Sequence, residues 1–592
     1  MKQTIITILL ALVTLAGQAR IKTVVWEQPP KAYTVDPSFE VRKVELTKKK
    51  TILYARYSGL PKGEFLINKD GYLQANGKQY AIIGSDSIQL GSKSYIDDSC
   101  EKDFVLYFEP LPKKTKEFDF IEGMGDDDFR VFGIHHKDFM MPTAPVPAEY
   151  QADLAEDEQL TEMKYSEEPV TIHFKALNYR KGMRTEITLQ YIDLKNIDKR
   201  RGGRVLHLND EGEAKISLSI YIPQRVWANI SNIPTGSSAE LFLAPGKELT
   251  VLVDMLRDDK DGNGKFVGYK GYAAKLFGEY RPASRDFLKK TEYSFQKMME
   301  CKDVVSLINY MKGRNASVEG WRKAAPYGEA VKDELQTYFN MPLILSSNVL
   351  DSLKQTDTFV DYISRNHAGQ VLSTTKHFSY DFFMTSQYYV KVKEARSFNA
   401  DLARYCYYLP KVLDGQNIEK PLIEDASLSA LYDKAVAEYQ KTVATNKQGI
   451  ADNIHYLDMT EVAPENILQT ILEKYKGKTV FIDIWATWCG PCRYGHKEMA
   501  PLKKGLKDKN IQFVYITSPS SPYKDWKGMI GEIPGDHYYL TKAQYDALLS
   551  LYKSNGIPTY AIYDANGNQT YTFVGFPGAE TFKEEINKAL NK

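Results

Sequence analysis

Two cysteines separated by two residues follow an almost entirely apolar stretch, and this feature constrains the fold of the 592-residue chain most strongly. Cys489 and Cys492 stand in the run Trp488-Cys-Gly-Pro-Cys492, directly after residues 479–485. A continuous apolar run of this length predicts a strand that is covered on both faces of its sheet. We expect Cys489 to begin the next helix. The spacing therefore predicts a strand, a turn and a helix, with a pair of sulfurs where the helix starts.

A pair of thiols at a helix N-terminus is suited to thiol–disulfide exchange. Free backbone N–H groups and the helix dipole stabilise a thiolate there, so Cys489 is the candidate nucleophile. Cys492 lies one turn further on and can close a ring with Cys489, which makes it the candidate resolving thiol. A zinc site is the alternative use of this spacing. Zinc needs two more ligands, and His496 is the only histidine nearby, so we expect no metal.

Asp483 is the one charged residue in the apolar strand. An unpaired carboxylate is costly to bury, so Asp483 is a candidate proton acceptor for Cys492. The alternative is an aspartate at a frayed strand end that hydrogen-bonds to the backbone. His496 lies four residues after Cys492 on the same helical face and could tune the pair, although a solvated histidine is the simpler expectation.

A proline precedes the strand predicted at 559–564. In the run Gly556-Ile-Pro-Thr559, a cis bond between Ile557 and Pro558 would let the Ile557 backbone face the dithiol and pair with an extended substrate. Pro558 also removes an N–H donor and a potential metal ligand from beside the sulfurs. The alternative is an ordinary trans proline in a loop, since only about 5–6% of such bonds are cis.

Taken together, these motifs resemble thioredoxins. With the phrase Trp485-Ala-Thr-Trp-Cys489, residues 456–592 are most similar to the TlpA-like family of cell-envelope disulfide reductases. The resemblance implies a thioredoxin fold in which Cys489 is the nucleophile, Cys492 the resolving thiol and Asp483 a buried proton relay. It implies no cofactor. The residues it implies for substrate binding are Trp488, Gly490, Pro491, Ile557, the cis-proline Pro558 and Gly575.

Two features depart from the pattern of this family. The helix proline, expected five residues after the second cysteine, is Pro501, nine residues after Cys492. The four extra residues make about one helical turn, so the kink moves without rotating the helix faces. The chain between the strands predicted at 512–517 and 559–564 is also longer than in a plain thioredoxin. We expect a short helix around Trp526 there, which shapes the choice of partner.

The first twenty residues have the pattern of a cleaved secretory signal peptide. Lys2 is followed by an apolar run over 5–15, and the small residues of Gly17-Gln-Ala19 suit a signal peptidase. We expect cleavage of residues 1–19 and a mature chain in the periplasm or cell envelope. A membrane anchor is the alternative, but a spanning helix needs about 20 apolar residues. No later stretch approaches that length, so no membrane span is expected after cleavage.

The periodicity of the remaining chain predicts a multidomain fold. Two all-β, sandwich-like domains are expected at 20–145 and 169–282, joined by a proline-rich, acidic linker at 146–168. An apolar spacing of 3.6 residues then predicts an α-helical connector domain at 283–455. Strands that alternate with helices predict a C-terminal α/β thioredoxin-fold domain at 456–592.

Charge and cysteine content exclude several classes of protein. The chain has 77 Lys and Arg against 76 Asp and Glu, so it gives no support to a nucleic-acid binder or a polybasic membrane-surface protein. Outside the pair there are three cysteines, Cys100, Cys301 and Cys406, so disulfides are not the scaffold. A bridge between Cys301 and Cys406 and two buried, inert thiols are both open.

The expected function is that of a thiol–disulfide oxidoreductase. The dipeptide Gly490-Pro491 matches the reducing thioredoxins, which favours a reductase of disulfide-containing envelope proteins. In an oxidising compartment the resemblance implies a membrane thiol as electron donor. The main alternative is an envelope binding or scaffold protein whose redox site is accessory. A peroxidase would need a threonine three residues before its cysteine, where this chain has Ala486.

Overall fold

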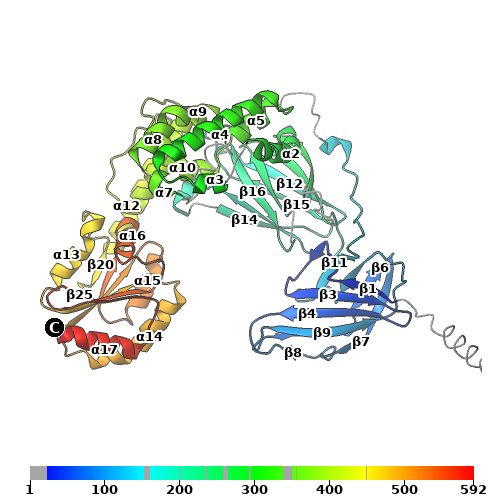
Figure 1. The fold of residues 1–592 in the computed structure, drawn as a ribbon, viewed down its shortest axis with the longest axis horizontal. Helices are drawn as coiled ribbons and strands as arrows, with labels where there is room; N and C mark the ends of the chain where they lie inside the picture. Colours follow the sequence, from blue (N-terminus) through cyan, green and yellow to red (C-terminus); the bar gives the residue numbers. More distant parts are fainter. Residues whose placement is uncertain are drawn as a thin grey trace, which may run out of the picture. The chain divides into compact units, whose positions relative to one another are not determined.

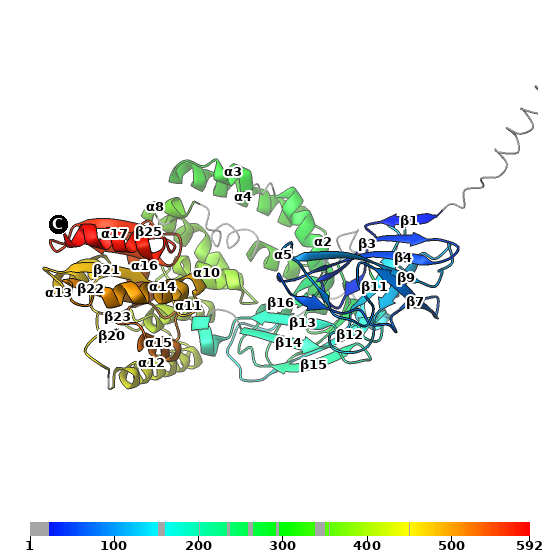
Figure 2. The ribbon, with the colours of Figure 1, turned by 90° about the horizontal axis from the view of Figure 1, so that it is seen from below.

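The structure is a computed structural model, and it forms two compact units (Figures 1 and 2). It describes residues 23–151, 160–199, 202–233, 237–257, 264–291, 295–337, 350–354, 356–448 and 450–591. The expected signal peptide lies outside the described residues, as does part of the predicted linker. The first unit comprises the described residues up to 194, the described residues between 201 and 353, and residues 374–380. The second unit takes 195–199, 354–373 and the residues from 381 onward.

The first unit begins with one continuous nine-stranded antiparallel sheet. Its order is β1-β3-β4-β9-β7-β6-β10-β11-β2, and β5 (Glu64–Phe65) pairs separately with β8 (Ser94–Tyr95). The nine strands are β1 (Val24–Glu27), β2 (Tyr33–Thr34), β3 (Phe39–Leu46), β4 (Thr51–Ser58), β6 (Tyr72–Ala75), β7 (Lys78–Asp86), β9 (Glu101–Phe108), β10 (Glu117–Ile121) and β11 (Arg130–His135). The β content predicted for 20–145 is present, and its strands are joined into one sheet through β7. The long strand β7 pairs with β6 and with β9, and its register shifts between Ile82 and Gly84, which lets one sheet bend around the core.

Two four-stranded sheets follow, in the orders β15-β12-β18-β19 and β14-β13-β16-β17. They are built from β12 (Val170–Leu177), β13 (Glu186–Tyr191), β14 (Gly202–His207), β15 (Glu213–Leu218), β16 (Gln224–Ile230), β17 (Ser238–Leu243), β18 (Glu248–Asp254) and β19 (Phe266–Gly271). Alternate residues such as Ile172, Phe174, Ile187 and Leu189 are buried in a single core. This segment has the two-sheet arrangement predicted for 169–282, and its last strand ends at Gly271.

The helices that follow do not form one connector domain, in contrast to the prediction for 283–455. They are α2 (Ala274–Lys290), α3 (Phe295–Met299), α4 (Val304–Ala324), α5 (Glu329–Leu335), α7 (Asp351–Lys354), α8 (Asp357–Ile363), α9 (Gly369–Thr374), α10 (Tyr380–Tyr389), α11 (Phe398–Leu413) and α12 (Ala426–Lys447). Helices α2 to α5 belong to the first unit, and α8, α11 and α12 to the second. Side chains of α2, α4 and α5, such as Phe277, Trp321 and Leu335, are buried in the core of the two sheets. Helical periodicity predicts a buried face, but it does not say which core that face joins.

Helix α2 begins at Ala274, before the boundary predicted at 283. Pro282 lies inside the helix, where a proline costs about 3 kcal/mol. The buried stripe of Leu276, Tyr280 and Phe287 continues across it. Tertiary packing therefore outweighs the local cost of the proline.

The C-terminal domain is a six-stranded mixed sheet with helices on both faces, in the order β20-β23-β22-β21-β24-β25. Strands β20 to β23 pair in parallel with their neighbours, while β24 and β25 are antiparallel. The elements are β20 (Ile454–Tyr456), α13 (Ile467–Lys474), β21 (Thr479–Ile484), α14 (Gly490–Gly505), β22 (Ile511–Thr517), α15 (Tyr523–Ile530), β23 (Asp536–Tyr539), α16 (Lys542–Leu551), β24 (Thr559–Tyr563), β25 (Gln569–Val574) and α17 (Ala579–Leu590). The short helix expected around Trp526 is confirmed as α15, and Pro501 lies inside α14.

The central strand β21 is buried on both faces, as its apolar sequence predicts. Ile482 and Ile484 pack in the cluster that contains residues of α13 and α16. Phe481 packs in the cluster on the other face, with residues of α14 and α17. Because successive strand residues alternate between faces, Asp483 shares the α14 face with Phe481. The fold therefore places the one charged residue of the strand beneath the helix that begins at the dithiol.

Candidate active site

The dithiol lies at the end of the central strand, where the chain turns into α14. Cys489 is the N-cap residue of this helix, and Gly490 and Pro491 are its first two residues. The turn is fixed by the neighbouring strand, because the N–H of Trp485 donates to the carbonyl of Ile516 at 2.9 Å. The hydroxyl of Thr517 donates to the carbonyl of Trp485 at 3.0 Å. The predicted strand, turn and helix are confirmed, with the first sulfur at the helix N-terminus.

The two cysteines form a disulfide, with Cα atoms 5.3 Å apart. The backbone N–H of Cys492 donates to Cys489 Sγ at 3.2 Å. This N–H is one of the free donors of the first helical turn, so it points at the sulfur on which a negative charge would form. Cys489 is 4% exposed and Cys492 is fully buried. A partner molecule can therefore reach the pair only at Cys489, through a small opening.

The segment around Pro558 lies against the same sulfur. The Ile557–Pro558 peptide bond is cis, and the carbonyl oxygen of Ile557 is 3.8 Å from Cys489 Sγ. The N–H of Gly575 donates to the carbonyl of Pro558 at 2.8 Å, which ties the start of β24 to the end of β25. Trp488 is 63% exposed beside Cys489. The structure thus brings Ile557, Pro558 and Gly575, which lie far from the dithiol in sequence, to one side of it.

Asp483 and His496 form a buried pair that the sequence analysis did not foresee. Asp483 is 2% exposed, and its Oδ2 lies 3.0 Å from Nε2 of His496, whose side chain is 8% exposed. The expectation of a solvated histidine is therefore wrong, and the carboxylate is not unpaired. His496 lies one turn after Cys492, and on α14 that face packs on the sheet. The spacing from Cys492 was the available sign of this contact.

Aromatic rings enclose the Asp483–His496 pair. The His496 ring meets Trp485 edge-on, with centroids 4.7 Å apart, and Tyr515 at 5.5 Å. Burial, together with the charge of Asp483, raises the pKa of the Tyr515 and Tyr560 phenols well above the ordinary value. Both phenols therefore stay protonated. Within the described residues, Asp483 Oδ1 has no hydrogen-bond partner, so one oxygen of this carboxylate is free to accept a proton.

A buried lysine lies on the same helix face. Lys503 is 8% exposed, and its Nζ is 4.7 Å from the ring centre of Tyr515. Burial lowers the pKa of Lys503 to about 8, and the charge of Asp483 opposes this shift. The sequence analysis missed this residue. The helical spacing of Cys492, Met499 and Lys503 places all three on the buried face.

The other cysteines are free thiols. Cys301 and Cys406 are buried and unbridged, so the open alternative of a bond between them is wrong. Burial raises the pKa of both thiols, which makes them poor nucleophiles. Cys100 is free and partly exposed. Among the described residues, no group of three or more His, Cys, Asp or Glu side chains is placed to hold a metal ion.

One family model matches the part of the chain that carries this site. Residues 456–590 match the Redoxin family model. The match covers the six-stranded sheet from near its first strand to the end of α17, and we call this part the redoxin domain. It contains both sulfurs, Asp483, His496 and the Ile557–Pro558 bond.

Sequence and structure searches find proteins that match only part of this chain. An uncharacterized protein of Haemophilus influenzae is 42% identical over 48 residues, which is 8% of this chain and 30% of that protein. The chain thus spans less than a third of the length of this curated relative. A thioredoxin-family thiol:disulfide interchange protein from Chlorobium tepidum is 26% identical, with a TM-score of 0.19, and the match covers 20% of this chain and 84% of that one. StoA from Bacillus subtilis is 20% identical, with a TM-score of 0.17 and coverage of 19% and 83%. Because these TM-scores are low, the function proposed below rests on the site geometry and the Redoxin match.

The described residues contain no helix that combines the length and the apolar character needed to cross a membrane.

Proposed function

We propose that the redoxin domain catalyses thiol–disulfide exchange and acts in the cell envelope as a reductase of protein disulfides. The observation that carries this proposal is the position of the sulfur pair. Cys489 caps α14, accepts the N–H of Cys492 at 3.2 Å, and is the one residue of the pair that is not fully buried. A thiolate at Cys489 is stabilised by this donor and by the helix dipole, and the thiolate is the form that attacks a disulfide.

The reaction transfers two electrons from the dithiol to a client disulfide. The thiolate of Cys489 attacks one client sulfur, a mixed disulfide forms, and the other client sulfur leaves as a thiolate. Cys492 then loses its proton and attacks Cys489 Sγ. The mixed disulfide breaks, the client's second thiolate leaves, and the Cys489–Cys492 disulfide forms. A thiol donor must then supply two electrons to restore the dithiol.

We assign Asp483 and His496 to the proton of Cys492. Their buried pair lies beneath the face of α14 that also carries Cys492, and Asp483 Oδ1, which has no hydrogen-bond partner among the described residues, can accept a proton. Neither group touches the client in this proposal. Asp483 receives the proton, and His496 is a positioning residue that holds the carboxylate by its other oxygen.

The client would contact residues around Cys489. Trp488 is exposed beside the sulfur, and Gly490 and Pro491 form the exposed start of the helix. Ile557 offers its backbone on the other side, where Pro558 and Gly575 are held together by a hydrogen bond. An extended client segment suits this arrangement, since backbone groups on one side can pair with it.

Reduction of insulin disulfides tests the activity. The full-length chain, supplied with dithiothreitol, should accelerate insulin reduction, and Cys489→Ser should abolish the acceleration. Cys492→Ser should accumulate a mixed disulfide on Cys489 that is released by reductant, and its mass identifies the client. Cys100→Ser is the matched control, because that thiol is also partly exposed but lies outside the redoxin domain. Insulin reduction that survives Cys489→Ser would leave a binding or scaffold role as the better description.

The midpoint potential of the Cys489–Cys492 pair tests whether the domain acts as a reductase or as an oxidase. Reducing thioredoxins have potentials of about −270 mV, while the strong oxidant DsbA is at about −120 mV. Equilibration of the full-length chain with glutathione buffers, followed by alkylation and mass measurement, gives the fraction of the Cys489–Cys492 disulfide. A value near that of thioredoxin is expected. A value near that of DsbA would reverse the assignment to an oxidase.

Export and the electron donor can be tested in cells. We expect the mature chain to begin after Ala19 and to be recovered with the periplasmic fraction. Its Cys489–Cys492 pair should be kept reduced by a membrane thiol protein. N-terminal sequencing of the fractionated protein tests the first expectation. Alkylation of free thiols in intact cells, followed by mass measurement of the Cys489–Cys492 pair with and without the membrane thiol protein, tests the second.

A further inference from the structure

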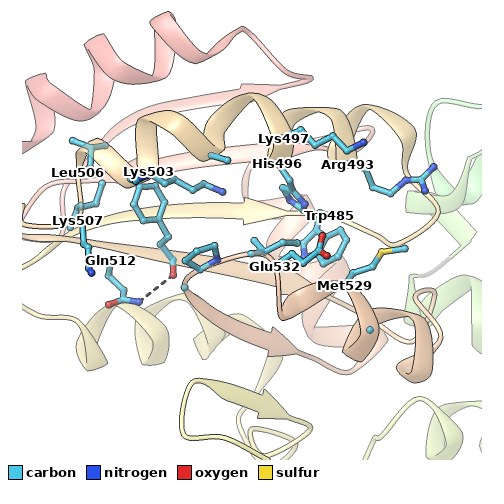
Figure 3. Close-up of a pocket in the computed structure, with 18 residues that line it drawn as sticks. Trp485, Arg493, His496, Lys497, Lys503, Leu506, Lys507, Gln512, Met529 and Glu532 are labelled. Atoms are coloured by element: carbon cyan, nitrogen blue, oxygen red, sulfur yellow. Dashed lines mark hydrogen bonds between the residues drawn. The ribbon is translucent and has the colours of Figure 1, made fainter.

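A cavity of the redoxin domain is lined by neither cysteine of the disulfide. Its volume is about 960 Å³, and its walls come from α14, α15, the start of β22 and the loop before β23 (Figure 3). Cys489, Cys492 and Ile557 are not among its lining residues. The volume falls in the range of small-molecule binding sites. Of its lining residues, only His496 has a role in the exchange proposed above.

The wall formed by α14 is strongly positive. Together with the turn that follows α14, it carries five cationic side chains: Arg493, Lys497, Lys503, Lys504 and, in the turn, Lys507. Glu532 is the one carboxylate among the lining residues, and none of the five cations has an ion-pair partner within the described part of the chain. Like charges four residues apart on a helix, such as Arg493 and Lys497, destabilise it. A wall of uncompensated cations attracts an anion.

Lys503 marks the point at which an anion would bind. Its side chain is drawn beneath α14 in Figure 3 and is nine-tenths buried, yet its nearest described partners are the rings of Tyr515 and Phe513, at 4.7 and 5.7 Å from Nζ. A buried cation is costly unless an opposite charge accompanies it. The low pKa of Lys503, about 8, reflects that cost. Asp483 offsets only part of this cost through its charge, and an anion in the cavity would offset more of it.

The remaining walls are apolar. They include Leu506 at the C-cap of α14, Ile511 and Phe513 on β22, and Met529 and Ile533 across the cavity. Figure 3 shows Leu506 and Met529 at opposite ends, with Lys503 between them. Apolar walls bind an apolar body, because its surface is removed from water. The ligand that fits both sets of walls has a negative head group and an apolar body.

We propose that this cavity binds a single-chain amphiphilic anion, with its carboxylate or phosphate head on Lys503 and its apolar chain along the walls of β22 and α15. The remaining lysines of α14 surround the head group. The bound anion takes no part in the dithiol chemistry, but its site adjoins that chemistry, since His496 lines the cavity and holds Asp483.

Calorimetric titration of the oxidised full-length chain tests the proposal. The probes are laurate and dodecyl phosphate, compared with dodecyltrimethylammonium and inorganic phosphate, each below its micelle-forming concentration. Both anionic amphiphiles should bind with one-to-one stoichiometry, and the cationic amphiphile and inorganic phosphate at least tenfold more weakly. The ratio between laurate and dodecyl phosphate then distinguishes a fatty-acid ligand from a phosphate-bearing one. Equal binding of the cationic amphiphile would overturn the proposal, as would no binding of either anion.

Variants locate the site. Lys503→Met should weaken laurate binding at least tenfold, and Lys507→Gln, at an exposed position of the same wall, should weaken it by a smaller factor. Lys476→Met is the matched control, since Lys476 is an exposed lysine of the same domain outside the cavity. The double variant Cys489→Ser, Cys492→Ser should bind laurate normally even though it cannot reduce insulin, so the two proposals fail separately. Unchanged binding by both Lys503→Met and Lys507→Gln would refute the site, as would capture on phosphatidylglycerol vesicles without binding of monomeric laurate.

Discussion

Replacement of His496 by phenylalanine tests how much the buried Asp483–His496 pair contributes to the stability of the redoxin domain. Phenylalanine keeps a ring against Trp485 and Tyr515 but removes the described hydrogen-bond partner of Asp483. Two unit charges 3.0 Å apart attract by about 5.5 kcal/mol at an effective dielectric constant of about 20, and desolvation offsets part of this. Breaking a buried ion pair costs about 3–5 kcal/mol, and losing a hydrogen bond from a neutral imidazole to a carboxylate costs about 1.5–3 kcal/mol. For an ion pair and for a neutral hydrogen bond alike, His496→Phe should therefore lower the stability of the domain by about 3 kcal/mol.

Hydrogen–deuterium exchange measures this loss without requiring the whole chain to unfold in one step. A loss of about 3 kcal/mol should make amides of β21 and α14 exchange about 100-fold faster at pH 7. Peptides from the sheets of the first unit serve as the internal control. Asp483→Asn in the same chain removes the charge and should restore most of the protection, so the double variant is less destabilised than the two single changes predict. Unchanged exchange in His496→Phe, or strict additivity with Asp483→Asn, would refute the pairing.

Three further predictions concern the packing and titration of the redoxin domain. Gly495→Ala should destabilise the domain by about 1–3 kcal/mol in the same exchange assay, because the new Cβ would lie 2.8 Å from the Tyr560 hydroxyl and 3.0 Å from the Phe576 ring. Adding Tyr560→Phe to this variant should recover part of the lost stability. Burial lowers the pKa of Lys503 from 10.5 to about 8, so the unfolded chain holds this proton to higher pH than the folded chain does. The free energy of unfolding should therefore rise by about 3 kcal/mol between pH 8 and 10.5. A rise of equal size in Lys503→Met would contradict this assignment to Lys503. Burial likewise lowers the pKa of His537 from 6.5 to about 4, so stability should fall as the pH drops from 6.5 to 4, and His537→Phe should lack that part of the acid loss in pH-dependent unfolding.

The redoxin domain was the most predictable part of the chain, because its decisive signals are local. The apolar run at 479–485 and the sulfur pair at its end define a strand, turn and helix within about 25 residues, and the structure has them as β21 and α14. Helix α16 and two short strands of this domain were missed. The strands β20 and β23 have three and four residues, too few for periodicity to appear.

The contacts that depend on distant packing were not predictable from single segments. The sequence places His496 on the face of Cys492, but the burial of that face depends on how closely α14 approaches the sheet. Gly495, whose missing side chain leaves room for Tyr560 and Phe576, allows that approach. In the same way, the continuity of the first sheet depends on the pairing of β7 with both β6 and β9, which lie on either side of it.

The segment inserted after β22 also changes the rim of the redoxin sheet. By adding β23, it leaves β20, three residues long, as the outermost strand on the parallel side. So short a strand offers little template for pairing with another chain. The opposite rim is β25, six residues long, with Phe573 and Val574 exposed near its end. Self-association in concentrated solution should therefore occur through the β25 edge of the domain. Mutations that suppress it should lie on the same strand.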